Sequence, residues 1–279
     1  MAFSNLFLVS CRSISMLIVL LMGLSFALEG FSFRAIFIGL LFSHFAMGFY
    51  YSKNNVLIIK QKKFALTLAS IVLLVGLYFA IYVTYLAPYF LVVHAALSDA
   101  YLLKTNAHSK NSEILALLRT VFYTASGSIA FIEMPVLLMN SFLIIGFLSM
   151  VTLLYIAEDK KTQLLFELPL FTLVIFTLFK DQPLHFHYMG FYHIVTWYVF
   201  SFWMLFFKEK NVKKTLSFFS KIALMSVAFI LIFNNVLDYS ITDNSFLQVI
   251  GVWSILHIFS TIPLSKFNPV FLKKIFYAT

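Results

Sequence analysis

The amino-acid sequence predicts an all-α integral membrane protein. Hydrophobic residues make up 62% of the 279 residues and only 11% are charged, whereas a soluble chain carries about 25% charged residues because its surface faces water. Uncharged apolar runs also recur at roughly the 20-residue length of a helix that crosses a hydrocarbon core. These observations exclude a soluble enzyme fold and a disordered chain, and the single cysteine, Cys11, excludes a disulfide scaffold.

Ten apolar segments are expected to form membrane-spanning helices, in one transmembrane domain over residues 1–279. The uncharged stretches 64–103 and 115–157 are too long for one span each. Pro88 and Pro135 divide them, because proline removes a helical hydrogen bond and clashes with the preceding turn. Without these two divisions the count is eight. The ten segments lie at about 5–28, 31–51, 64–85, 87–103, 114–132, 135–157, 163–179, 184–207, 215–237 and 245–263.

The distribution of basic residues favours ten spans over eight, because cytoplasmic loops are rich in Lys and Arg. With ten spans, fifteen lysines fall on one face and only Arg34 and Lys180 on the other. With eight spans, Lys104 and Lys110 move to the poor face. The sequence therefore predicts ten helices with both termini cytoplasmic, in a bacterial inner (plasma) membrane. The formal charge of +9 then serves orientation, and no nucleic-acid partner is expected.

Four histidines on four different helices are expected near the middle of the bilayer. At about 1.5 Å per residue, His44, His94, His193 and His257 lie roughly 10–20 Å from the non-cytoplasmic ends of their helices. Ionisable side chains inside a membrane are costly and usually functional, and neutral imidazole is a good ligand for Fe(II), Zn(II) or Cu. A shared metal site is one interpretation. Separate hydrogen bonds to neighbouring helices are the other.

Short motifs around these histidines resemble those of the Brp/Blh family of membrane beta-carotene dioxygenases. The similarity runs in the same order from about residue 35 to the end, and a proline-leucine pair, Pro183-Leu184, precedes the third motif as it does in the family. Asn268-Pro269 and a basic tail follow the last motif. The motifs are Leu41–Met47, His94–Asp99, Tyr188–His193 and His257–Pro263.

The resemblance implies an Fe(II) oxygenase that cleaves beta-carotene with dioxygen to retinal, with His44, His94 and His193 as iron ligands. The chain departs from the family at two positions. Trp197 stands where the family has a fourth ligand histidine, and Gly48 stands where it has an acid. Three alternatives therefore stay open: a three-histidine site, a fourth ligand from His187 or His257, or altered chemistry.

Other residues are expected to support such a site. Asp99 is about 140° around the helix from His94, so it would orient that histidine through another helix or a water. Tyr188, Tyr192 and Trp197 would line a tunnel for a lipid-soluble isoprenoid, or would simply pack helices together. Glu133 and Glu167 are expected at helix ends near the interface.

Two other functions compete with the carotenoid oxygenase. A histidine-ligated lipid oxidase or desaturase would usually carry clustered HxxxH boxes, which the sequence lacks. A transporter or small-molecule-binding membrane protein would use the histidines as a proton relay. It would be expected to show inverted repeats, and the sequence shows no repeat.

Overall fold

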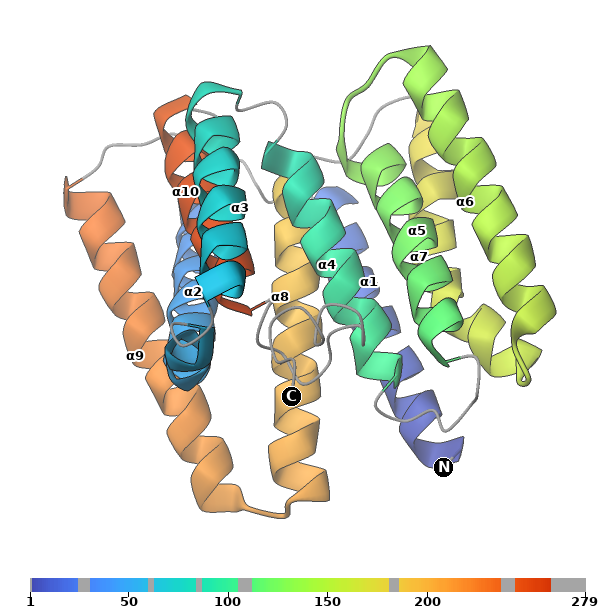
Figure 1. Ribbon diagram of the computed structural model, residues 1–279. Coiled ribbons are helices and arrows are strands. Elements are labelled where there is room, and N and C mark those ends of the chain that lie inside the picture. The colour runs from blue at the N-terminus through green and yellow to red at the C-terminus, as the bar shows by residue number, and fades with distance from the viewer. Residues whose placement is uncertain are drawn as a thin grey trace. The chain divides into compact units, whose positions relative to one another are not determined.

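The described part of the chain is all-helical. The computed structural model describes residues 2–24, 31–59, 63–83, 87–104, 112–180, 186–236 and 244–261, and these contain ten α-helices, one π-helical turn and no strand (Figure 1). The elements are α1 (Ala2–Leu24), α2 (Phe31–Ile59), α3 (Lys63–Tyr82), α4 (Ala87–Lys104), α5 (Ser112–Phe131), α6 (Val136–Ile156), α7 (Lys160–Lys180), α8 (Phe186–Trp203), the π-turn η3 (Met204–Lys208), α9 (Val212–Val236) and α10 (Asn244–Thr261).

Each of the ten predicted segments corresponds to one of these helices. The two proline divisions are both confirmed: α3 and α4 are separate helices, and Pro135 is the N-cap residue of α6. The largest difference lies in α2, which continues to Ile59 instead of ending near residue 51. The polar residues at 52–55 end the apolar run, but they do not end the helix, because hydropathy does not by itself set helix boundaries.

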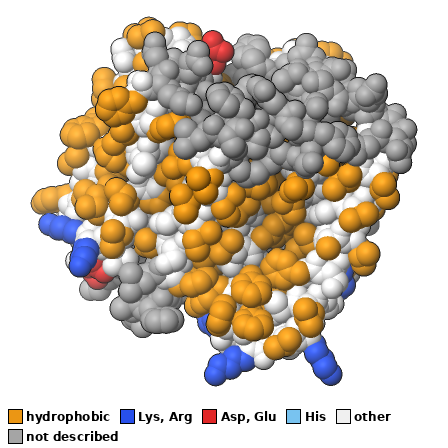
Figure 2. All heavy atoms as spheres, turned by 180° about the vertical axis from the view of Figure 1, so that it is seen from behind, with side chains coloured by type: hydrophobic (Ala, Val, Ile, Leu, Met, Phe, Trp, Pro, Cys, Tyr) orange, Lys and Arg blue, Asp and Glu red, His pale blue; other side chains and the backbone are white. Residues whose placement is uncertain are grey.

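Several helices are suited to a lipid environment. Five helical segments are long and apolar enough to cross a membrane, among the residues that the structure describes. Only 17% of the apolar window in Val136–Ile156 is buried, and the same holds for Val212–Phe233. Hydrophobic side chains dominate the coloured surface in Figure 2. Such outward-facing apolar helices are consistent with a membrane-embedded protein. The other three segments are Glu113–Phe131, Lys160–Phe179 and Tyr188–Lys208.

The helices group into two compact units, each built from distant parts of the sequence. Unit 1 combines Met1–Ala27 with Leu91–Trp203, and unit 2 combines Leu28–Phe90 with Met204–Thr279. Within unit 1, α1 packs against α7 and α8, while α5 packs against α6 and α7. Within unit 2, α2 packs against α9 and α10, and α10 also packs against α3.

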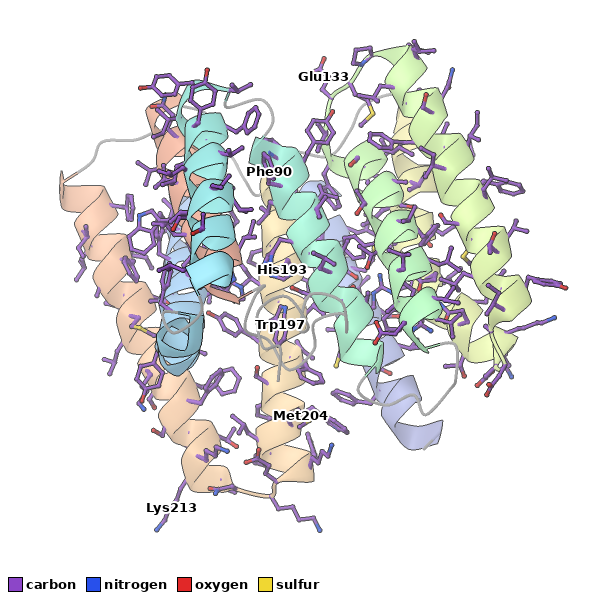
Figure 3. All side chains as sticks on the ribbon, in the orientation of Figure 1. Phe90, Glu133, His193, Trp197, Met204 and Lys213 are labelled. Atoms are coloured by element: carbon purple, nitrogen blue, oxygen red, sulfur yellow. The ribbon has the colours of Figure 1, made fainter. Side chains whose placement is uncertain are left out.

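Polar side chains cap two helices at short connections. Oδ1 of Asp159 accepts a hydrogen bond from the backbone N–H of Thr162 at 3.0 Å, and Oδ1 of Asn211 accepts one from the N–H of Lys214 at 2.9 Å. Hydrogen bonds from Thr162 also lower the pKa of Asp159. These caps define the starts of α7 and α9. Figure 3 shows Lys213 in the first turn of α9.

Small residues bring α3 and α10 into close contact in unit 2. A Cβ atom added to Gly76 would lie 2.8 Å from Cγ2 of Ile255, and one added to Gly251 would lie 3.3 Å from Cβ of Ala80. Gly76 and Ala80 are four residues apart on α3, as are Gly251 and Ile255 on α10. Such reciprocal spacing lets two helix backbones approach closely in the absence of water.

Replacing Gly76 by alanine is expected to destabilise the protein. The added Cβ overlaps Ile255, and overpacking costs about 1–3 kcal/mol, against about 1 kcal/mol gained in helix propensity. Gly146→Ala is the matched control, because its Cβ would meet Ala125 Cβ at an ordinary 3.5 Å. Thermal unfolding in detergent should place Gly76→Ala below Gly146→Ala. Equal stability of the two variants would contradict the close α3–α10 contact.

Candidate metal-binding histidines and a buried charge network

In unit 1, α4 and α8 bring His94 and His193 together. Their ring centroids lie 5.1 Å apart with an interplanar angle of 70°. Both side chains are buried, with exposed fractions of 4% and 3%. Figure 3 shows His193 near the middle of α8, with Trp197 one turn further along the helix. Two of the three predicted ligands are therefore neighbours within one unit.

In unit 2, α2 and α10 form a second histidine pair. The ring centroids of His44 and His257 lie 4.8 Å apart, with an interplanar angle of 54°. His257 is buried, whereas His44 is half-buried. The rings of Phe45 and Phe49 lie 5.3 and 6.5 Å from the His257 ring. The third predicted ligand, His44, thus pairs with one of the two residues considered for the fourth position.

Both histidine pairs fit two neighbouring positions on a metal ion. Two imidazoles bound through bonds of about 2.1 Å, at angles of about 90–110°, would have ring centroids about 4.5–5.2 Å apart. The observed distances of 4.8 and 5.1 Å fall in that range. No group of three or more His, Cys, Asp or Glu side chains with metal-binding geometry occurs within the described residues. Each unit therefore offers two imidazole ligands.

The other histidines lie outside this description. The backbone of His187 belongs to α8, but its side chain is not among the described ones, and His185 and His108 are in ranges that the structure does not describe. The same is true of Asn268-Pro269. The interpretation of His187 as a fourth ligand stays a prediction.

Trp197 occupies an aromatic cluster in place of the family's ligand histidine. Together with Phe200 it packs against the buried ring of Phe166 on α7, and the rings of Trp197 and Phe200 meet edge to face at 5.9 Å. Tyr188 and Tyr192 are buried on the same helix. These contacts hold α7 against α8, and the predicted tunnel along Tyr188, Tyr192 and Trp197 stays a prediction.

A buried arginine forms the centre of a charge network in unit 1, which the sequence analysis did not predict. Arg12 on α1 is only 2% exposed. Its Nε lies 2.9 Å from Oδ2 of Asp99 on α4 and donates to the hydroxyl of Tyr192 on α8 at 3.1 Å. One terminal nitrogen donates to the carbonyl of Phe166 at 2.6 Å and lies 3.3 Å from Oε2 of Glu167. Arg12 therefore joins α1, α4, α7 and α8.

A second arginine completes the network. Nε of Arg119 on α5 lies 3.7 Å from Oε1 of Glu167, and its terminal nitrogen donates to Gln163. Gln163 in turn donates to Oε1 of Glu167 at 2.8 Å. The guanidinium of Arg12 also lies 4.0 Å from the centroid of the Phe166 ring. The network holds two arginines and two carboxylates, so its formal charges balance.

Two sequence expectations about the acids change. Glu167 was expected at a helix end, but α7 continues from Lys160 to Lys180 through Pro169, and Glu167 is only 1% exposed inside the network. That expectation was wrong, because proline does not end this helix. Glu133 is exposed in the connection between α5 and α6, as expected. Arg12 and Arg119 were detectable as charges inside predicted apolar segments, but their partners lie on other helices.

The charge network and the His94–His193 pair share two helices. Asp99 follows His94 by five residues on α4, and Tyr192 directly precedes His193 on α8. Because Nε of Arg12 contacts both Asp99 and Tyr192, it fixes the register of α4 against α8 where the histidines meet. Direct orientation of His94 by Asp99 stays a prediction. No protein-family model matches the chain, and no curated protein or solved structure is significantly similar to it.

Replacing Arg12 by methionine is expected to cost about 3–5 kcal/mol of unfolding free energy, because it leaves two buried carboxylates without their main cation. Arg12→Lys should fall between wild type and Arg12→Met, since lysine keeps the charge but loses the planar fork. The control is Lys214→Met, which removes the exposed Lys214–Glu209 pair and should cost at most about 1 kcal/mol. Denaturant unfolding in mixed micelles measures all three. Similar losses for Arg12→Met and Lys214→Met would contradict a stabilising network.

Proposed function

We propose that the protein is a membrane-embedded non-heme iron oxygenase that uses dioxygen to cleave a lipid-soluble polyene. The observation that carries the proposal is the presence of two histidine pairs in apolar helices, with ring centroids 4.8 and 5.1 Å apart. Neutral imidazoles suit Fe(II). Single histidines that only bonded neighbouring helices would have no reason to occur in pairs at this spacing. A carotenoid, with beta-carotene giving retinal, is the substrate that the motif resemblance supports.

The resemblance supports His44, His94 and His193 as the iron ligands, with His187 or His257 as a fourth. When bound, iron would supply the activation of dioxygen for oxidative cleavage of a double bond. The chain's own contribution is to hold the imidazoles and to exclude water. Asp99 and Arg12 contribute by fixing α4 against α8.

The substrate reaches the protein from the lipid in this proposal. A carotenoid is apolar over almost its whole length, so its binding site needs aromatic and aliphatic walls with few polar groups. Tyr188 and Trp197 on α8 are the proposed walls, together with the ring of Tyr192. The Tyr192 hydroxyl accepts a hydrogen bond from Arg12, so only the ring would face the substrate.

We also propose ten membrane spans with both termini cytoplasmic, in a bacterial inner membrane. The ten separate helices support the count. The concentration of lysine in the connections on one face supports the orientation. Lys160 and Lys161 begin α7, and Lys213 and Lys214 begin α9, so the first turns of both helices would lie on the cytoplasmic side.

A membrane transporter is the second candidate, and the buried charges of unit 1 favour it. Charged residues within membrane helices often mark ion or proton pathways. In this protein, however, Arg12 and Arg119 are already matched by Asp99 and Glu167 at 2.9–3.7 Å. Such a closed network is better suited to holding helices together, so the oxygenase is the preferred function.

Purified wild-type protein is expected to contain stoichiometric iron, and His44→Ala, His94→Ala and His193→Ala should each lower the iron content strongly. Loss of one imidazole leaves an ion with too few protein ligands in an apolar site. His108→Ala is the matched control, because the sequence places His108 in a connection between spans. Elemental analysis by mass spectrometry provides the measurement. Iron-free wild type, or variants that keep the wild-type iron content, would exclude the oxygenase.

Expression in carotene-accumulating bacteria tests the substrate. The orange colour should fade and retinal should appear in cell extracts, and His94→Ala at an equal membrane level should keep the colour. Chromatography of the extracts measures both compounds. Persistent carotene without retinal, from an iron-containing wild type, would exclude beta-carotene as the substrate and leave another lipid-soluble polyene.

A further inference from the structure

The α10 helix places His257 directly over Gly48 of α2. A Cβ atom added to Gly48 would lie 2.4 Å from both Cε1 and Nδ1 of His257, and 3.7 Å from its Nε2. Real Cβ atoms essentially never come that close to another heavy atom. The imidazole therefore occupies the space that any side chain at position 48 would need.

This contact also explains how His257 reaches His44. Residues 44 and 48 are one turn apart on the same face of α2, so a ring seated over Gly48 lies beside the His44 ring, with centroids 4.8 Å apart. Phe45 and Phe49 flank the same ring. The α2–α10 contact thus forms an apolar niche that holds two imidazoles.

The backbone of α10 is held in place near this niche. Gly251 packs against Ala80 of α3, where an added Cβ would lie 3.3 Å from the alanine Cβ. The hydroxyl of Ser260 donates to the carbonyl of His257 at 2.8 Å. These contacts fix the depth and rotation of α10, and with them the position of the His257 ring.

We propose that His257 is a metal ligand that acts together with His44, and that Gly48 is the position that makes this possible. The ligand class is Fe(II) or another first-row divalent ion that prefers imidazole. The inference rests on the proposed function and selects His257 over His187 as the additional ligand. It also accounts for Gly48, because the helix α10 supplies an imidazole where the resembling family has an acid on the first motif.

The chemistry of the side chain supports a ligand over a space-filling role. A leucine or phenylalanine would fill an apolar niche between Phe45 and Phe49 without a desolvation cost. A buried imidazole carries such a cost, which a metal bond offsets. Packing alone would therefore not require histidine at position 257.

Anaerobic titration of the purified full-length protein with Fe(II) tests the proposal. His257→Leu and His257→Asn should each weaken Fe(II) binding by at least about 10- to 100-fold, a loss typical even of groups that only support a ligand. Gly48→Ala should weaken it too, because it displaces the ring while all histidines remain. The matched control is Trp253→Leu, one turn earlier on α10, whose ring packs against Phe42 and Phe49. It should lower thermal stability and leave Fe(II) affinity unchanged.

The outcomes separate this inference from the proposed function. Wild-type affinity in both His257 variants, with binding lost in His94→Ala, would overturn the role of His257 and leave the iron oxygenase in place. Absence of Fe(II) binding by wild type would overturn both. Equal losses in Trp253→Leu and His257→Leu would show that α10 packing, and not a ligand, controls binding, and would also overturn the role of His257.

Discussion

The interaction on which unit 1 depends is the burial of the Arg12 guanidinium among helices that are otherwise apolar. A cation in such a place is stable only when anions and acceptors surround it. Asp99 and Glu167 supply the charges, and Tyr192 supplies a hydroxyl. Because each partner comes from a different helix, satisfying this one side chain determines which helices meet and at what register. The pairing of His94 with His193 follows from that register.

Unit 2 reaches a similar result without buried charge. Its helices approach through small residues, with Gly76 and Gly251 at the α3–α10 contact and Gly48 at the α2–α10 contact. Where a side chain is missing, the neighbouring helix fills the gap, and at Gly48 the group that fills it is an imidazole. Close backbone approach thus takes the place of an ion pair in bringing two histidines together.

The sequence was sufficient for the helices but not for their partners. Hydropathy and two prolines predicted ten helices, because both act locally along the chain. The ion pairs of Arg12 join residues 87 and 155 positions apart, and no local pattern reports such a contact. The pairing of His44 with His257 depended on the absence of a side chain at Gly48, which the sequence marked only as a departure from a family motif. The end of α7 was misplaced because Pro169 bends or interrupts many helices but not this one.

The central claim is that imidazoles of this protein bind iron inside the membrane domain. X-ray absorption spectroscopy at the iron edge of the purified protein tests it most directly. The account predicts iron–nitrogen distances of about 2.1 Å and the outer-shell scattering that imidazole rings produce, with fewer imidazoles in His257→Leu. A protein that retains no iron, or iron surrounded only by oxygen without imidazole scattering, would contradict it.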